Sequence, residues 1–380
     1  MTILGFTWYY VLTFLAVLSV LIYVHEFGHY WVARRNGVRV EVFSIGFGPE
    51  LWGWTDRDGT RWKICAIPLG GYVKMFGEYI PSEEETGESR PLTPEEEAVS
   101  FTHKRLGQRA AIVAAGPIAN FLFAVVVFTA VFTVQGNPIP LAVIGEVVAG
   151  TPAAEVCIQP GDKILAIESE PVTKFDDIRR IIGGHAGVPV RIRILRDGTE
   201  ITVVATPRAT ANADAATGEV RVGRIGVKPD PTQIAYERQN PLMALWMGAE
   251  RTVALTGQIL SYLGQLIVGQ QDSRDLGGPL RIAQMSGEVA QDGGFSSLLL
   301  FTAVLSINLG LINLFPIPML DGGHLLFYAA EALRGRPLSP RTQEYGFRFG
   351  LALVLMLTVF ATWNDLVNLK VIEFLRQLIS

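Results

Sequence analysis

Two histidines and a glutamate stand at a spacing that suits metal binding. In L-I-Y-V-H-E-F-G-H-Y-W-V-A-R-R, residues 21–35, His25 and His29 are four residues apart, and Glu26 lies between them. On a helix this spacing places both imidazoles on one face, one turn apart, where both can bind a single Zn²⁺. Zinc lowers the pKa of a water ligand to about 7, and Glu26 can take that proton without being a ligand. The pattern predicts hydrolytic zinc chemistry.

The residues around this motif are apolar enough for lipid. Ionisable side chains at that depth of a bilayer cost several kcal/mol each unless something compensates them. A metal ion held by neutral histidines beside a carboxylate provides that compensation. The alternative is a chance match, but only five histidines occur in 380 residues, so a random H-E-x-x-H is rare in such a chain.

A hydrolytic zinc site takes three protein ligands and leaves the fourth position open. The third ligand must reach the same depth as the two histidines. One other apolar segment carries a suitable side chain, N-L-F-P-I-P-M-L-D-G-G-H at 313–324. We expect Asp321 to be the third ligand, at the cytoplasmic end of a membrane span. His324, one helical turn later, is the alternative.

The composition indicates a membrane protein with at least one soluble module. Hydrophobic residues make up 49% of the chain and charged residues 18%, and the mean hydropathy is +0.31, which is too apolar for an ordinary soluble protein. The net charge of -4 gives no sign of nucleic-acid binding. The first apolar run is too long, and too poor in basic residues at its start, for a cleaved signal peptide.

Four apolar stretches are long enough to cross a bilayer, which takes about 20 residues. They run from Trp8 to Ala33, from Arg109 to Val134, from Ser297 to Phe315 and from Phe347 to Leu366. Basic residues cluster after the first span, before the second, and between the third and fourth. Because basic loops stay in the cytoplasm, both of these loops are expected there, and both termini and the segment 135–296 outside. Cys65 and Cys157 then lie on opposite sides and form no disulfide.

A fifth apolar stretch, 242–268, contains Glu250 and Arg251 in its middle. This pattern favours a helix lying on the membrane surface. A crossing at 242–268 would also place Asp321 on the far side of the bilayer from His25 and His29. We therefore expect four spans.

Outside the membrane, residues 144–172 resemble a PDZ domain, with a helix start at Thr151 and Pro152. A strand pair with a turn at Asp197-Gly198 follows. The segment G-R-I-G-V at 223–227 resembles a PDZ peptide-binding loop, late in the sequence as in circularly permuted bacterial PDZ domains. The residues of this loop are Arg224, Ile225, Gly226 and Val227. It would either bind a peptide carboxylate or belong to a domain that blocks bulky proteins; we favour the size filter.

On the predicted cytoplasmic side, residues 61–78 alternate like a β-hairpin. The segment Gly70–Met75, with Gly71 and Tyr72, is a candidate strand edge for an unwound substrate, and a purely structural hairpin is the alternative. The acidic stretch 78–98 is expected to be a flexible, solvated loop. Asn120, in the second span, is expected to mark a kink or an inter-helix hydrogen bond without a catalytic role.

These elements predict a multi-pass α-helical membrane protein with four transmembrane helices. It carries an inserted, extracytoplasmic, β-rich α+β PDZ domain and a membrane-associated β-hairpin on the cytoplasmic side. The expected domains are an N-terminal membrane core at 1–134, the PDZ domain at 135–229, an interfacial amphipathic linker at 230–296 and a C-terminal membrane core at 297–380.

Four motifs resemble those of the site-2 protease family of intramembrane zinc metalloproteases, peptidase family M50, and especially its bacterial regulator of sigma-E protease branch. They are H-E-F-G-H at 25–29, G-G-Y-V-K-M-F-G-E at 70–78, G-P-I-A-N at 116–120 and N-L-F-P-I-P-M-L-D-G-G-H at 313–324. The resemblance implies one Zn²⁺ on His25, His29 and Asp321, with Glu26 as general base. It also implies that Asn308 and Asn313 hold the substrate backbone. Better-known members of this branch have two PDZ modules, whereas this sequence shows one.

The sequence thus predicts a zinc endopeptidase of the bacterial inner membrane that cuts transmembrane segments, with its active site towards the cytoplasm. The resemblance points to single-pass substrates within the lipid bilayer, such as anti-sigma factors after a first cut and remnant signal peptides. A catalytically inert PDZ scaffold is the alternative, and the complete ligand set with Glu26 argues against it. A transporter would need inverted repeats, and none is evident.

Overall fold

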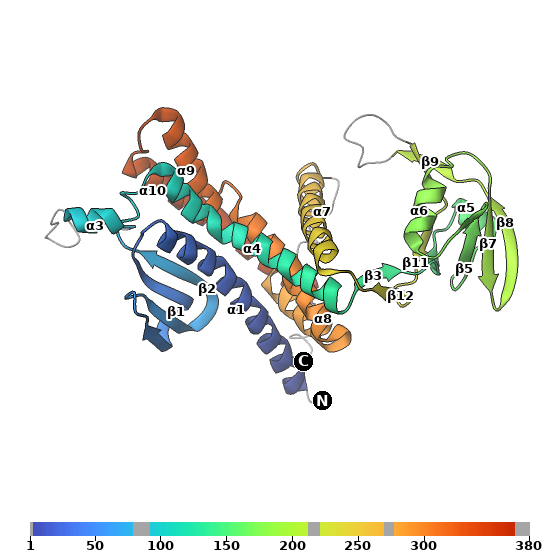
Figure 1. The fold of residues 1–380 in the computed structure, drawn as a ribbon, viewed down its shortest axis with the longest axis horizontal. Coiled ribbons are helices and arrows are strands. Elements are labelled where there is room, and N and C mark those ends of the chain that lie inside the picture. Colours follow the sequence, from blue (N-terminus) through green and yellow to red (C-terminus); the bar gives the residue numbers. More distant parts are fainter. Residues whose placement is uncertain (1–2, 79–91, 212–220, 270–276, 369–380) are drawn as a thin grey trace. The chain divides into compact units, whose positions relative to one another are not determined.

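A computed structural model describes residues 3–78, 92–211, 221–269 and 277–368. The chain forms two compact units. The first comprises Met1–Val131 and Pro241–Ser380, and the second, Phe132–Asn240, is inserted between them. Figure 1 gives the order of the elements along the chain. The predicted PDZ segment, 135–229, falls within the second unit.

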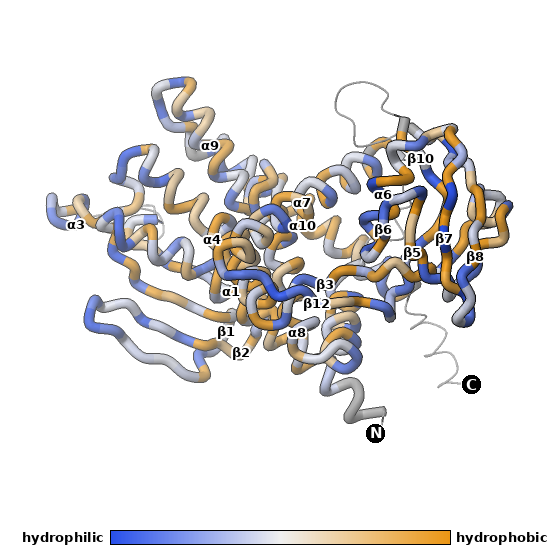
Figure 2. Tube along the Cα trace, turned by 45° about the vertical axis from the view of Figure 1, so that its right-hand side comes forward, coloured by the Kyte–Doolittle hydropathy of each residue, from blue (hydrophilic) through white to orange (hydrophobic). Residues whose placement is uncertain are grey.

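Four helices of the first unit are long and apolar enough to cross a membrane, as the sequence predicts. They are α1 (Ile3–Arg35), α4 (Leu106–Val134), α8 (Pro279–Asn313) and α10 (Pro340–Asn368). Hydrophobic residues predominate along α1 and α4 (Figure 2), as expected of helices that face both lipid and other helices.

The third of these helices carries an additional helical segment before the predicted span. The predicted span starts at Ser297, but α8 starts at Pro279 and bends at Gly294, whose φ is 67°. A glycine adopts this left-handed conformation without the steric cost that a Cβ brings. The Gly293-Gly294 pair is therefore a kink between two helical segments, and the second segment begins close to the predicted start at Ser297. The first segment, 279–293, lies in the predicted interfacial linker.

The first turn of α8 is capped by an aspartate from another helix. Asp365 of α10 is 1% exposed and accepts hydrogen bonds from the backbone N–H groups of Gly278 at 2.7 Å, Leu280 at 2.9 Å and Arg281 at 3.1 Å. These N–H groups have no partner within their own helix, and a carboxylate at this end also interacts favourably with the helix dipole. Asp365 therefore joins α10 to the start of α8.

Replacing Asp365 by alanine should lower the thermal unfolding midpoint of the purified protein. Hydrogen bonds to a charged group contribute about 1.5–3 kcal/mol each, and buried donors without partners are costly. Asp365→Asn keeps one acceptor oxygen and should lower the midpoint less. An Asp365→Ala protein as stable as the native one would show that the cap contributes nothing.

The amphipathic helix α7 (Pro241–Ile267) is not among the candidate spans of the described residues. Leu242, Trp246 and Val253 are exposed along it. At Gly248 it packs closely on α4, where a Cβ would lie 2.9 Å from Oγ1 of Thr129. This arrangement agrees with the expectation of four spans.

The predicted hairpin extends further than residues 61–78. β1 (Val40–Thr55) and β2 (Arg61–Met75) are antiparallel, and β1 pairs with β2 on both of its sides. Ile45, for example, is opposite Gly71 on one side and Ile64 on the other. The segment 71–74 thus forms an edge of this small sheet, paired on one side with 42–45.

The described part of the acidic stretch is not a flexible loop, which corrects the prediction there. Residues Pro94–Val99 form α3, capped by a reciprocal pair of hydrogen bonds between Thr93 and Glu96. The sequence T-P-E-E has a Ser/Thr N-cap, proline at the first helical position and glutamate at the third, which together favour a helix start. Residues 79–91 lie outside the described part of the chain.

The second unit is β-rich, with one four-stranded sheet in the order β6-β5-β7-β8 and further two-stranded pairings. Isoleucines dominate its core, including Ile164, Ile192 and Ile194. Its sheet contains β5 (Lys163–Ile167), β6 (Glu170–Pro171), β7 (Val190–Arg196) and β8 (Thr199–Ala205). Its other elements are α5 (Pro152–Glu155), α6 (Phe175–Gly183), β3 (Asn137–Pro140) with β12 (Ile234–Glu237), β4 (Ile144–Val147) with β11 (Val227–Pro229), and β9 (Arg208–Ala211) with β10 (Arg221–Arg224).

Two predicted local features of this unit are confirmed. The short helix α5 follows an N-cap at Thr151, with Pro152 at its first position. Asp197 and Gly198, between β7 and β8, have φ values of 49° and 80°, as a tight two-residue hairpin requires.

Candidate metal centre

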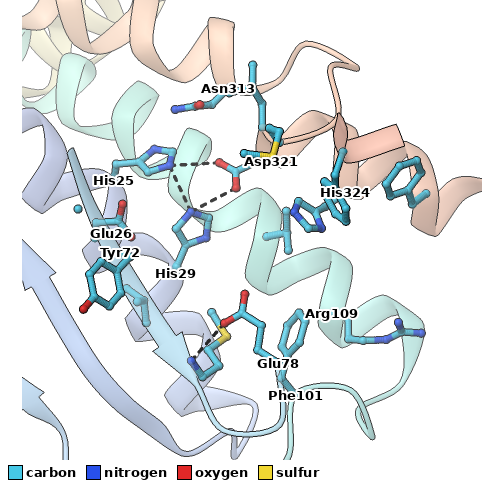
Figure 3. A pocket seen from close by; sticks show the side chains of 18 of the residues that line it. His25, Glu26, His29, Tyr72, Glu78, Phe101, Arg109, Asn313, Asp321 and His324 are labelled. Carbon is cyan, nitrogen blue, oxygen red and sulfur yellow. Dashed lines mark hydrogen bonds and ion pairs between the residues drawn. The ribbon is translucent and has the colours of Figure 1, made fainter. Parts of the chain in front are cut away.

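Three potential metal ligands meet inside the first unit. The Nε2 atoms of His25 and His29 on α1 are 3.2 Å apart. Asp321 brings Oδ2 to 3.1 Å from Nε2 of His25 and Oδ1 to 3.5 Å from Nε2 of His29. Figure 3 shows the two rings and the carboxylate pointing at one another. In the described part of the chain, this is the group of histidine, cysteine and acidic side chains that could hold a metal ion.

These distances fit a zinc ion. Tetrahedral zinc with bonds of about 2.0–2.1 Å keeps its ligand atoms roughly 3.3 Å apart. The observed separations of 3.1, 3.2 and 3.5 Å are close to this value. Two neutral imidazoles and a carboxylate are also among the donor sets that catalytic zinc takes.

Helix α4 contacts both histidine rings at Nδ1, the ring nitrogen that does not face Asp321. Nδ1 of His29 lies 2.9 Å from the backbone oxygen of Ile112, a distance at which an Nδ1–H donates a hydrogen bond. Nδ1 of His25 lies 3.1 Å from the side-chain amide of Asn120. With its proton on Nδ1, His29 presents the lone pair of Nε2 to a metal.

Gly116 of α4 provides the space in which these rings lie. A Cβ at this position would collide with Nε2 of His29 and would lie 2.9 Å from Cε1 of His25. Gly28 of α1 faces α4 in the same way, since a Cβ there would lie 2.8 Å from Cβ of Ala119. Small residues on both helices thus allow the backbones to approach closely.

The Gly116→Ala protein should bind zinc at least about tenfold more weakly, because the added methyl group displaces the imidazole of His29 and the support of metal ligands contributes on this scale. Gly107→Ala is a matched control on the same helix, where a Cβ meets nothing within 4 Å. Zinc affinity of each purified variant, measured by competition with a chelator, checks this. Equal affinities would exclude a steric role for Gly116.

Asp321 was predicted at the end of the third span, but it lies outside that span. α8 ends at Asn313, and Asp321 is the first residue of a separate helix, α9 (Asp321–Arg334). Pro316 and Pro318 prevent the third helix from continuing. Gly322 and Gly323 let α9 start close to the linker, because a Cβ on Gly323 would lie 2.6 Å from Cα of Pro318.

The electrostatic surroundings favour an ionised Asp321. Burial by itself raises the pKa of this carboxyl, but the neighbouring imidazoles of His25 and His29 outweigh it and hold the pKa well below its usual range. The N-terminus of α9 favours a negative charge as well. Asp321 is thus an anion at neutral pH, as a zinc ligand must be.

A cavity of about 1120 Å³ opens beside this cluster. Glu26, Gly70, Gly71, Tyr72 and Asn313 line it, together with the three potential ligands. Figure 3 shows Glu26 next to His25, with Tyr72 close by. Strand β2 lies tightly against α1 here, because a Cβ on Gly71 would be 3.1 Å from Cγ of Glu26.

Comparison with known proteins identifies the family. The profile described as Peptidase family M50 matches residues 13–357. The chain belongs to peptidase family M50. A Rhizobium meliloti protein named as a putative zinc metalloprotease is 45% identical over 361 residues, which cover 94% of this chain and 96% of that protein. An Agrobacterium fabrum protein with the same description is 44% identical over 368 residues, 96% of this chain and 97% of its own. Metalloprotease MmpA of Caulobacter vibrioides is 38% identical over 388 residues, 96% of this chain and 97% of its own.

This M50 peptidase is therefore a zinc metalloprotease, and its apolar helices make it a membrane protein. The zinc prediction from H-E-x-x-H is confirmed at the level of the family. The assignment of individual residues to zinc stays a prediction that the geometry above supports.

The alternative ligand, His324, faces the same cavity but lies apart from the cluster. It is on α9, one turn after Asp321, and its ring centroid is 5.3 Å from that of Phe347. Burial lowers the pKa of His324, so its imidazole is neutral at neutral pH. The group whose ligand atoms lie within 4.8 Å of one another contains Asp321 and not His324.

The predicted substrate residues divide into two sets. Gly70, Gly71, Tyr72 and Asn313 line the cavity of the M50 peptidase. Asn308, which the structure also describes, is half-buried on α8 and is not among the lining residues. The position of Asn308 outside the cavity lining therefore does not support its predicted contact with substrate.

Several residues around the site were not assigned to it from the sequence, although the inter-helix hydrogen bond predicted for Asn120 is present. Asn120 and Gly116 face the histidines from α4, and the motif G-P-I-A-N that contains both was a signal for them. An ion pair also lines the cavity, in which Nη2 of Arg109 lies 2.5 Å from Oε1 of Glu331. Glu78 also lines the cavity, and burial raises the pKa of its carboxyl.

The predicted PDZ loop lies in the second unit. Ile225 is buried in its core, and its backbone oxygen accepts a hydrogen bond from the N–H of Ala153 at 2.9 Å. Gly226 has a φ of 81°, and Val227 starts β11, while Arg224 ends β10. Peptide binding by these four residues stays a prediction.

Proposed function

We propose that this M50 peptidase hydrolyses peptide bonds within transmembrane segments of other proteins, with zinc held by His25, His29 and Asp321. The main support is the convergence of these three side chains and Glu26 on one cavity between helices that suit a lipid bilayer. A buried cluster of this kind is costly in a membrane unless it serves a function.

Each residue has a defined task in this proposal. Bound zinc supplies Lewis-acid chemistry that polarises the scissile carbonyl and activates water. Glu26, adjacent to His25 but outside the ligand cluster, takes the proton from the attacking water and returns it to the leaving amine. Ile112 and Asn120 hold the two imidazoles in place.

A substrate helix must be unwound before its carbonyl groups can be attacked, because its own hydrogen bonds occupy them. The strand edge at 71–74 is suited to bind the unwound segment by adding a strand to the sheet. This edge pairs with 42–45 on one side and lies against Glu26. Asn313, across the cavity, has an amide that can bond the substrate backbone.

The membrane orientation follows from the distribution of basic residues. We place the metal centre towards the cytoplasm and the inserted unit, with both termini, in the periplasm of a bacterial inner membrane. Cys157 is exposed in the inserted unit, whereas Cys65 is buried.

A thiol reagent that cannot cross membranes should therefore label Cys157 in cells with a permeabilised outer membrane. Labelling only after the inner membrane is broken would reverse this orientation.

The inserted unit is proposed to be a PDZ domain that excludes bulky proteins from the active site. Anti-sigma factors shortened by a first cut, and remnant signal peptides, would then be suitable substrates.

A chain without residues 132–240 should cleave full-length and shortened versions of one substrate at similar rates. If such a chain still preferred the shortened version, the size filter would lie elsewhere.

The decisive experiment reconstitutes the full-length protein with a single-pass membrane substrate and maps the products by mass spectrometry. The expected result is a zinc-dependent cut inside the transmembrane segment. Zinc-loaded protein that never cleaves such substrates would favour the alternative of an inert PDZ scaffold. A cut confined to exposed loops would show a protease of a different specificity.

A further inference from the structure

Helix α4 contacts both histidines, at Nδ1 of each ring and, at Gly116, along the ring edge that includes Cε1. Ile112, Gly116 and Asn120 follow one another at intervals of four residues and so share one face of the helix. The first accepts a bond from His29, the second leaves room for both rings, and the third lies against His25. One helix thus determines the orientation of both imidazoles.

Asn120 is held rigidly in this position. The residue is fully buried. Its backbone oxygen accepts a hydrogen bond from Oγ of Ser306 on α8 at 2.9 Å. A Cβ on Gly310 of α8 would lie 3.2 Å from Cβ of Asn120, so α8 also closes against its side chain. The amide can therefore rotate about its own bond but cannot move away from His25.

The position of the proton on His25 decides what Asn120 must do. Zinc binds the lone pair of Nε2, and a neutral imidazole then carries its proton on Nδ1. That Nδ1–H needs an acceptor, because an unpaired buried donor is costly. An amide nitrogen cannot accept a hydrogen bond, whereas an amide oxygen can.

The two ends of the Asn120 amide are interchangeable in shape. Nδ2 lies 3.1 Å from Nδ1 of His25, and Oδ1 is buried without a hydrogen-bond partner. A half-turn of the amide exchanges these atoms with little change in the space that they fill. It gives Oδ1 a donor and leaves Nε2 of His25 free for the metal.

We propose that Asn120 is a positioning residue for the zinc site, and that its side-chain oxygen accepts a hydrogen bond from Nδ1 of His25. This inference rests on the ligand set proposed above. The competing arrangement has Nδ2 donating to Nδ1, which places the proton on Nε2, towards Oδ2 of Asp321 at 3.1 Å. That arrangement suits a metal-free site and makes Asn120 a structural contact between helices.

Two substitutions of nearly equal size separate the arrangements. Asn120→Asp retains an acceptor but removes the amide donor, and Asn120→Leu removes both. Zinc affinity of each full-length protein in detergent is measured by competition with a chromophoric chelator, and the thermal midpoint of each metal-free protein shows whether it folds. Asn120→Leu should bind zinc about 10–100-fold more weakly, the range for residues that support metal ligands. Asn120→Asp should bind nearly as tightly as the native protein.

Equal weakening by both substitutions, in folded proteins, would overturn the proposal, because it would mean that the donor is what matters. A native protein that binds no zinc would instead refute the ligand set, so the two failures are distinguishable. A measurement on the native protein needs no variant. In the zinc-loaded chain labelled with ¹⁵N-histidine, Nδ1 of His25 should carry a proton. A bare or metal-bound Nδ1 would contradict the inference.

Discussion

Replacing Glu26 by glutamine should reduce cleavage by about 10²–10⁴-fold, the usual contribution of a general acid–base group. Zinc should still bind at one ion per chain, because Glu26 is adjacent to the ligands but is not in the cluster of His25, His29 and Asp321. The amide of glutamine has the same shape as the carboxylate but takes no proton from water. Cleavage rate and zinc content of the same preparation check both parts of the prediction.

Glu78 provides a matched control for this experiment. It lines the same cavity, but its carboxylate bonds the backbone N–H of Met75 at 3.3 Å. Glu78→Gln should therefore have a much smaller effect than Glu26→Gln. A Glu26→Gln protein that cleaves at the native rate would remove Glu26 from the mechanism, whatever its zinc content.

Replacing Asp321 by alanine should remove most of the bound zinc and, with it, more than about 10³-fold of the cleavage rate. The two histidines alone leave a catalytic zinc ion short of its third protein ligand. The Lewis-acid contribution of such an ion is several kcal/mol, and each 1.36 kcal/mol is tenfold in rate. Zinc content by atomic absorption and cleavage of a model substrate give the result.

The matched variant is His324→Ala, one turn further along α9. His324 lines the cavity but lies outside the ligand cluster, so this protein should retain its zinc. If the outcome were reversed, with zinc lost from His324→Ala and kept by Asp321→Ala, the third ligand would be His324.

The sequence was sufficient to predict the four membrane helices and the clustering of His25, His29 and Asp321. A long apolar run in a membrane has few alternatives to a helix, because a helix forms all its backbone hydrogen bonds within one segment. The H-E-x-x-H spacing identified two of the three clustered side chains. The requirement that Asp321 reach the same depth then excluded a crossing at α7, and the structure agrees.

The errors concern where helices begin and end. Asp321 was expected on the third span, although Pro316 and Pro318 already signal a break before it. The start of α9 gave no usual signal, since Leu320 at its N-cap makes no side-chain hydrogen bond. The predicted span start at Ser297 lies close to the kink at Gly294, but the helical segment before the kink was not predicted as part of α8. That segment carries Arg281, Glu288 and Asp292, which do not suit a membrane span.

The role of Asn120 was beyond the reach of the sequence for a different reason. A polar residue in a span predicts a hydrogen bond but not its partner. That partner depends on how α4 is rotated against α1, which in turn depends on the close approach at Gly28 and Gly116. Packing of this kind emerges only in three dimensions.

The position of Asp321 on α9 has a consequence for biosynthesis. The histidine pair is translated near the beginning of the polypeptide, but the carboxylate that joins it follows only after the third hydrophobic helix has emerged from the ribosome. With the ligand set proposed above, a nascent or truncated molecule would have an incomplete zinc site and no hydrolytic activity. Proteins next to it at the insertion machinery would then be protected from cleavage until synthesis is almost finished.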